Sequence, residues 1–213
     1  MDSICRINSK EEFSSLVNEF TGLLSRAFYN DSFYIWIMPN DKKRMEHLEW
    51  WMRILLKYTL IHGDIHYTED HKAVSMWLGP DKPIVNDFKI FSMGLILYPF
   101  KIGLKNFMRA LDISGQWSKE HKKMNERHYY LMIIAVEPEF QGKGIGSRLM
   151  QVGLNKADSD GLECFLETVT PEDVQFYKKH DFEIILNNDF GENDQYWLMT
   201  RDPSVEIKGS SIV

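Results

Sequence analysis

The most constraining feature of this sequence lies near its middle, where an apolar run, a proline and three closely spaced glycines follow one another. Residues 129–136 read Tyr-Tyr-Leu-Met-Ile-Ile-Ala-Val, and such a near-continuous apolar run is typical of a central strand covered on both faces. Pro138 stops the strand, and Gly142, Gly144 and Gly146 lead into a helical pattern. We therefore expect a buried strand, a glycine-rich turn and a helix in direct succession.

The glycine-rich turn has the composition of a phosphate-binding site. Its three glycines remove side chains where a row of backbone N–H groups can converge at the start of a helix. Those donors, with the positive end of the helix dipole, favour a pyrophosphate group. Lys143 and Arg148 add positive charge nearby.

Several interpretations of this turn compete. A Walker-type loop requires Ser or Thr directly after Gly-Lys, and Gly144 follows Lys143, which excludes it. A dinucleotide-binding fold requires Gly-x-Gly-x-x-Gly in its first strand–turn–helix unit. Here the spacing is Gly-x-Gly-x-Gly, late in the chain, although Glu163 lies about twenty residues on, as in that fold. A turn that merely joins a strand to a helix also stays open.

A third phosphate-loop interpretation accounts for more of the sequence. Residues 141–146 fit the pattern Gln/Arg-x-x-Gly-x-Gly/Ala, and the segment resembles the acetyl-CoA motif of the GNAT superfamily of N-acetyltransferases. A second motif follows, because residues 165–182 resemble the next strand and helix of that superfamily, which end in Phe-Tyr-x-x-x-Gly-Phe.

Within the superfamily, the chain most resembles the group similar to puromycin N-acetyltransferase. The shared features are a Leu-Glu-Thr strand at 166–168, a His-aromatic-Tyr-Leu segment at 128–131 and a Trp-x-Met-Thr-Arg segment at 197–201. Two departures matter. Asp173 stands where the family usually has Asn, and Asp181 stands where the signature has Gly. Asp tolerates a left-handed backbone better than most residues, so the turn at position 181 can survive.

The resemblance implies an α/β (α+β) fold with a mixed, mostly antiparallel central sheet flanked by helices, and here with an enlarged helical N-terminal half. In that half the residues predict a helix capped by Ser9, a helix at 41–62 and a hairpin from strands at 65–68 and 73–78. We expect one domain over residues 1–202 and a poorly ordered tail over 203–213.

The segment from Pro83 to Asn125 also has a helical pattern. We predict breaks near Pro99 and Gly115. The apolar run at 91–100 is too short to span a membrane, and we interpret it as a buried or pocket-lining helix.

By this resemblance the chain moves an acetyl group directly from the thioester of acetyl-CoA, its co-substrate, to a primary amine. Tyr177 matches the tyrosine of the superfamily and is the predicted general acid. The backbone N–H of Val136 is the candidate donor to the thioester oxygen. The predicted cofactor-binding residues are Ile134, Ala135, Val136, Gln141, Gly142, Lys143, Gly144, Ile145, Gly146, Ser147, Asp173 and Tyr177.

The general base is less clear from the sequence. Glu167 is our candidate, and Glu137 and His128 are alternatives. A solvated or salt-bridged carboxylate is the competing interpretation for each glutamate, and a structural role for the histidine. The main alternative function is a non-catalytic acyl-CoA sensor or interaction domain of the same fold, and an NAD-dependent oxidoreductase is a further one.

The acceptor is predicted from the aromatic N-terminal half. An aromatic wall for a small-molecule amine competes with simple core packing of these side chains. The aromatic residues concerned are Phe33, Tyr34, Trp36, Trp50, Trp51, Trp77 and Trp117.

Composition narrows the class of protein further. The chain has 213 residues, is 44% hydrophobic and carries a net charge of −6 without a block of like charge, which argues against a nucleic-acid-binding tail. Cys5 and Cys164 match no metal-ligand spacing, and two reduced thiols fit a cytoplasmic protein. The N-terminus lacks the pattern of a signal peptide. We expect a monomer or homodimer without metal, nucleic-acid or membrane partners.

Overall fold

The structure is a computed structural model and describes residues 3–81, 93–124 and 127–204. The last nine residues of the predicted tail, 205–213, lie outside these ranges, as do residues 82–92 of the segment predicted to be helical.

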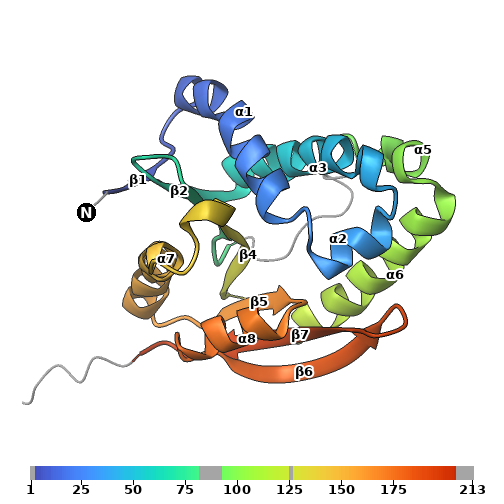
Figure 1. The fold of residues 1–213 in the computed structure, drawn as a ribbon. Helices are drawn as coiled ribbons and strands as arrows, with labels where there is room; N and C mark the ends of the chain where they lie inside the picture. Colours follow the sequence, from blue (N-terminus) through green and yellow to red (C-terminus); the bar gives the residue numbers. More distant parts are fainter. Residues whose placement is uncertain (1–2, 82–92, 125–126, 205–213) are drawn as a thin grey trace, which may run out of the picture.

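A seven-stranded sheet runs through the molecule in the order β1-β2-β3-β4-β5-β7-β6 (Figure 1). Every neighbouring pair is antiparallel except β4 and β5, which are parallel. The predicted mixed, mostly antiparallel sheet flanked by helices is therefore confirmed. The strands are β1 (Ile4–Arg6), β2 (Gly63–Thr68), β3 (Ala73–Leu78), β4 (Tyr129–Val136), β5 (Cys164–Thr168), β6 (Glu183–Phe190) and β7 (Asp194–Arg201).

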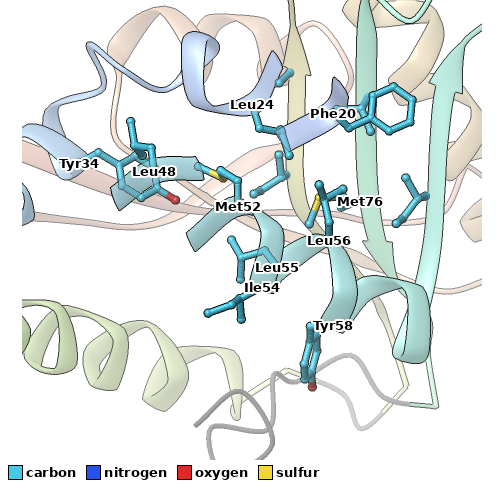
Figure 2. Close-up of a cluster of buried hydrophobic side chains, with 14 of the residues drawn as sticks. Phe20, Leu24, Tyr34, Leu48, Met52, Ile54, Leu55, Leu56, Tyr58 and Met76 are labelled. Carbon is cyan, nitrogen blue, oxygen red and sulfur yellow. The ribbon is translucent and has the colours of Figure 1, made fainter. Parts of the chain in front are cut away.

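Helices α1 (Lys10–Ala27) and α3 (Asp41–His62) cover one face of the sheet. The Ser9 hydroxyl accepts a hydrogen bond from the Glu12 N–H at 3.1 Å, so the predicted N-cap is confirmed. Figure 2 shows the apolar stripes of both helices meeting above the sheet, with Phe20 and Met52 among the fully buried side chains. Burial of these stripes holds the helices on the sheet.

A short helix between α1 and α3 escaped prediction. The sequence around Asp31 and Pro39 indicates a break, yet α2 (Ser32–Ile37) forms one turn and a half there. Asp31 is its N-cap, with the carboxylate accepting a hydrogen bond from the Tyr34 N–H at 3.2 Å. Six residues are too few to show a helical period, so the sequence pattern carries no signal for α2.

The segment before β4 corrects two predictions. Gly103, with a φ of 87°, separates α5 (Tyr98–Ile102) from α6 (Leu104–His121), whereas Gly115 lies inside α6 and breaks nothing. The predicted buried helix at 91–100 was wrong in part. Its described residues form the 3-10 turn η1 (Leu95–Leu97) and the start of α5, and Phe100 is 86% exposed while Tyr98 is buried.

Helix α7 (Ile145–Asp160) covers the other face of the sheet, and α8 (Pro171–Lys178) follows β5 (Figure 1). The contact of α7 with the sheet is close at Gly153, where an added Cβ would lie 2.3 Å from the Trp77 ring. Only glycine lets the helix backbone approach the indole to this distance. Trp77 is therefore core packing between sheet and helix, as the competing interpretation for the aromatic residues has it.

Candidate active site

Strands β4 and β5 separate along their length, and this separation creates the site. They pair only at their first residues, Tyr129 with Cys164 and Tyr130 with Phe165, while β5 stays paired with β7 throughout. A cavity of about 1010 Å³ occupies the region between the diverging strands. Its walls come from both strands, the glycine-rich turn and α8 on one side, and from α2, α3, α5 and α6 on the other.

The backbone of Val136 points into this gap. Neighbouring residues of an antiparallel pair alternate between bonding the partner strand and facing away from it. Glu137 donates its N–H to the Lys72 carbonyl at 2.8 Å, so the polar groups of Val136 face away from β3 and toward the side that β5 has left. The Gln141 amide binds the Val136 carbonyl at 3.1 Å. The Val136 N–H is thus directed into the gap between β4 and β5.

The glycine-rich turn forms an open cradle beside Val136. Gly142 and Gly144 have φ values of 74° and 77°, which L side chains rarely adopt, and nothing lies within 4 Å of a Cβ built on either. Gly144 is the N-cap of α7, so the first free N–H groups of that helix open at the cradle. This is the geometry that favours a bound phosphate.

The predicted cofactor-binding residues come together at this cavity with one exception. Eleven of the twelve line it. Lys143 does not, because its exposed ammonium binds the Glu139 carbonyl at 3.1 Å and lies over the Phe140 ring. Lys179 of the α8 C-terminus lines the cavity and was missed, because only the fold brings it beside the turn.

Helix α8 presents Tyr177 and Asp173 to the same cavity. Burial, followed by the charges of Asp173 and Glu167, raises the pKa of Tyr177, so its phenol stays protonated at neutral pH. Burial also raises the pKa of Asp173, whose carboxylate accepts a 3.4 Å hydrogen bond from Thr168. Tyr177 could therefore donate a proton to a ligand in the cavity, and Asp173 could form a hydrogen bond with that ligand.

The turn after α8 keeps the shape of the family signature without its glycine. Asp181 has a φ of 64°, the left-handed region, and the Phe182 N–H still bonds the Tyr177 carbonyl at 3.2 Å. The expectation that Asp supports this turn is confirmed. Phe176 lines the cavity beside Tyr177.

Glu167 lies on β5 at the point where the strands have separated, and it lines the cavity. One carboxylate oxygen accepts a hydrogen bond from the Tyr130 hydroxyl, and the other is buried without a partner among the described residues. Burial raises the pKa of Glu167 to about 7, although the bond from Tyr130 opposes this rise. A carboxylate with a pKa near the working pH suits general-base chemistry.

The two alternatives for the base lie elsewhere. Glu137 forms a two-pronged ion pair with Arg26 of α1, with N–O distances of 2.6 and 3.1 Å, and it does not line the cavity. His128 is buried and its ring nitrogen is 2.6 Å from that of His121. His121 lines the cavity, but burial and the neighbouring His128 lower its pKa to about 3. Both alternatives thus have structural partners.

The far wall of the cavity is aromatic. Four of the seven aromatic residues considered from the sequence line it, and Trp36, Trp50 and Trp77 do not. Phe28, Tyr98 and Phe107 were not identified from the sequence. Aromatic residues of a helix have the same sequence pattern whether they face a core or a cavity. The aromatic lining is Phe28, Phe33, Tyr34, Trp51, Tyr98, Phe107 and Trp117.

Asp31 also lines the cavity and was read from the sequence only as part of a break. Burial raises the pKa of Asp31 to about 7. Hydrogen bonding opposes this rise, and the charge of Asp173 adds to it. Three carboxyl groups therefore line the cavity, those of Asp31, Glu167 and Asp173, and burial raises the pKa of each, to about 7 for Asp31 and Glu167. Within the described ranges, no helix is long and apolar enough to cross a membrane, and no group of side chains has the arrangement of a metal site.

Comparison with known proteins agrees with this geometry. Residues 111–184, from α6 to the start of β6, match the family described as "Acetyltransferase (GNAT) domain". A protein of Schizosaccharomyces pombe described as an uncharacterized N-acetyltransferase is 24% identical over 193 residues, covering 85% of this chain and 78% of that protein.

Solved structures share the fold over nearly the whole chain. A structure described as histone acetyltransferase HPA2 and related acetyltransferase, from Corynebacterium glutamicum, superposes with a TM-score of 0.58 and 20% identity, covering 97% of this chain and 99% of that one. Arylalkylamine N-acetyltransferase 2 from Aedes aegypti gives a TM-score of 0.62 with 12% identity, covering 95% and 100%. At such identities the likeness concerns the fold.

Proposed function

We propose that this chain, an acetyltransferase that carries a GNAT domain, moves an acetyl group from acetyl-CoA directly to a primary amine of a small molecule. The observation that carries the proposal is the single cavity that joins the glycine cradle, Tyr177 and Glu167 to an aromatic wall. A donor site and an acceptor site must meet at one point for direct transfer. Here they meet where β4 and β5 separate.

The cradle supports the donor half of the site. The backbone N–H groups from Gln141 to Ser147 would bind the pyrophosphate of acetyl-CoA, and the space above Gly142 and Gly144 leaves room for it. The Val136 N–H would donate to the thioester oxygen as that oxygen gains charge. Donors of this kind contribute roughly 3 to 4 kcal/mol to transition-state stabilisation in other enzymes.

Glu167 would take one proton from the ammonium group of the acceptor, which leaves the neutral amine. The Glu167 oxygen that has no partner within the described ranges would accept this proton, and Tyr130 holds the other oxygen in place. The neutral amine then attacks the thioester carbon, a C–N bond forms and the C–S bond breaks. Because a general base acts in its ionised form, the raised pKa of Glu167 sets the start of the active pH range near 7.

Tyr177 would donate a proton to the leaving sulfur, and its phenolate would take up the second proton that the nitrogen loses as the amide forms. A thiol has a pKa near about 8.5, so the thiolate needs little help to leave. The Tyr177 phenol is protonated at neutral pH, since burial raises a pKa that is ordinarily near 10, and it lines the cavity from which the sulfur would leave. A general acid of this kind contributes typically about 100- to 10,000-fold.

The aromatic wall supports a small-molecule acceptor over a protein one. Seven aromatic side chains enclose the acceptor half, and enclosed apolar pockets with few polar groups are typical of small-molecule sites. The fold neighbour from Aedes aegypti, named for arylalkylamines, is consistent with such an acceptor. The narrower resemblance to the puromycin N-acetyltransferase group stays a prediction.

The test has two parts. Acetyl-CoA, free CoA and NAD are compared for their effect on the melting temperature, and a ligand at a hundredfold excess over its dissociation constant adds about 2.7 kcal/mol to stability. A shift with acetyl-CoA and none with NAD is expected. Primary amines of aromatic, aliphatic and amino-acid type are then screened for release of the CoA thiol.

The outcomes separate the alternatives. Thiol release with at least one amine supports the transferase. A shift without thiol release from any amine would point to an acyl-CoA sensor, and a shift with NAD alone would point to an oxidoreductase.

A further inference from the structure

Asp31 has an unusual position for a helix cap. Its carboxylate caps the short helix α2 through Tyr34, yet the residue also lines the cavity. No cationic side chain of the described residues forms an ion pair with it. Asn would cap α2 equally well, so capping alone does not account for an ionisable group at this place.

The surroundings of Asp31 favour a cation. Phe28 and Tyr34, three residues before and after Asp31, also line the cavity, and their rings lie edge to face with a centroid distance of 5.7 Å. Aromatic faces attract ammonium groups. The nearby charged groups are the carboxylates of Asp173 on α8 and Asp194 on β7, which add to the negative potential.

A second, independent observation points to a ligand in the same half. Tyr98 is only 2% exposed, lines the cavity, and has a hydroxyl without a partner among the described residues. Buried polar groups normally have a partner, and one without is expected to meet a ligand or water. Tyr34 connects Tyr98 with the carboxyl groups of Asp31 and Glu167. Burial, followed by the charges of these two groups, raises the pKa of the Tyr34 phenol, and burial, followed by Tyr34, raises the pKa of Tyr98.

We infer that the acceptor is a small diamine, whose second, non-reacting ammonium group pairs with Asp31 while the reacting amine lies at Glu167. This inference rests on the proposed function and names its substrate class. An apolar or aromatic body joining the two nitrogens would pack on the aromatic wall.

The chemistry requires a second charge for this pairing. The reacting nitrogen has to be neutral before it attacks the thioester, so it cannot compensate Asp31 during transfer. A non-reacting ammonium group keeps its charge throughout and stays paired with Asp31 in both ground state and transition state. Such uniform binding lowers KM and leaves kcat unchanged.

The experiment compares amines that differ only in the second charge. One pair is 1,4-bis(aminomethyl)benzene and 4-methylbenzylamine, and another is 1,5-diaminopentane and pentylamine. For Asp31→Asn we expect the KM of each diamine to rise about 10- to 100-fold, as for loss of a charged hydrogen bond. The KM of each monoamine should stay within about twofold, and kcat should be unchanged throughout.

Asp41→Asn is the matched control. It removes a carboxylate from the first turn of α3, where the side chain is exposed and outside the cavity. It should leave both classes of amine unaffected.

The inference fails if wild type shows no preference for the diamines, or if Asp31→Asn changes diamines and monoamines equally while acetylation persists. Absence of acetylation with every amine would instead refute the proposed function, and the inference with it.

Discussion

The two walls of the cavity are built in different ways. The wall proposed to bind the cofactor, called the cofactor wall below, comes mainly from one continuous stretch, residues 134–147, to which α8 adds Asp173 and Tyr177. The acceptor wall is assembled from α2, α3, α5 and α6, whose contributing residues are far apart in sequence. Backbone geometry defines the first wall and side-chain packing the second. The first is therefore visible as a motif, while the second is not.

Substitution of Glu167, which lies between the two walls, should give the largest loss of activity. Glu167→Gln keeps the shape and an acceptor for Tyr130 but removes the base. We expect kcat/KM for the amine to fall about 100- to 10,000-fold. In wild type, log kcat/KM should rise with pH through about 7, because the pKa of Glu167 is raised and only its ionised form accepts a proton. With a monoamine acceptor, which does not use Asp31, the variant should lose this inflection.

Glu137→Gln is the control for that comparison, because Glu137 is paired with Arg26 outside the cavity. Its pH–rate profile should match that of wild type. Equal loss of rate in both variants would contradict the assignment of the base.

On the cofactor wall, Tyr177→Phe should lower kcat by about 100-fold, the lower end for a general acid, with the acetyl-CoA dissociation constant nearly unchanged. Single-turnover kinetics with a competent amine measure this. Tyr129→Phe serves as control, since its hydroxyl binds Asp160 at 2.6 Å away from the cavity. Unchanged turnover in Tyr177→Phe would remove it from the mechanism.

The cradle itself is tested by Gly144→Val. The side chain would enter the space for the pyrophosphate and strain the backbone, so acetyl-CoA affinity should fall about 10- to 100-fold, as for lost charged hydrogen bonds. Gly161→Val introduces the same kind of strain at the other end of α7, where φ is 64°. Titration calorimetry should show weakened binding in the first variant alone, and equal weakening would place the effect in the fold.

The smallest expected effects are changes in stability, compared between a glycine of α7 and a glycine of α6. Gly153→Ala should lower the free energy of unfolding by about 1 to 3 kcal/mol, because its methyl group would overlap the Trp77 ring. Gly115→Ala lies inside α6 with open space around it and should raise stability by about 0.5 to 1 kcal/mol. Urea denaturation measures both. A neutral Gly153→Ala would mean that α7 can shift away from the sheet.

Most of the fold could be predicted where periodicity is long. The helix at 41–62 and the strand at 129–136 have the bounds expected, because many apolar positions repeat in each. Short elements such as α2 could not be predicted, because they contain too few residues to show a repeating apolar pattern. The break predicted at Gly115 was wrong, because packing of α6 outweighs the modest cost of one glycine in a helix. The exposed Phe100 shows that an apolar run does not by itself reveal which side faces the core.

The sequence by itself determined the cradle and its strand, since glycines at 142 and 144 have one evident use, a backbone conformation that other residues avoid. It also marked Glu167 and Tyr177 as candidates. Only the tertiary structure decided which carboxylates share the cavity. It paired Glu137 with Arg26, left an oxygen of Glu167 without a partner in the described part of the chain, and brought Asp31 in from a distant helix. The physical reason is that ionisation and pairing depend on burial and on neighbours in space, which a sequence pattern does not record.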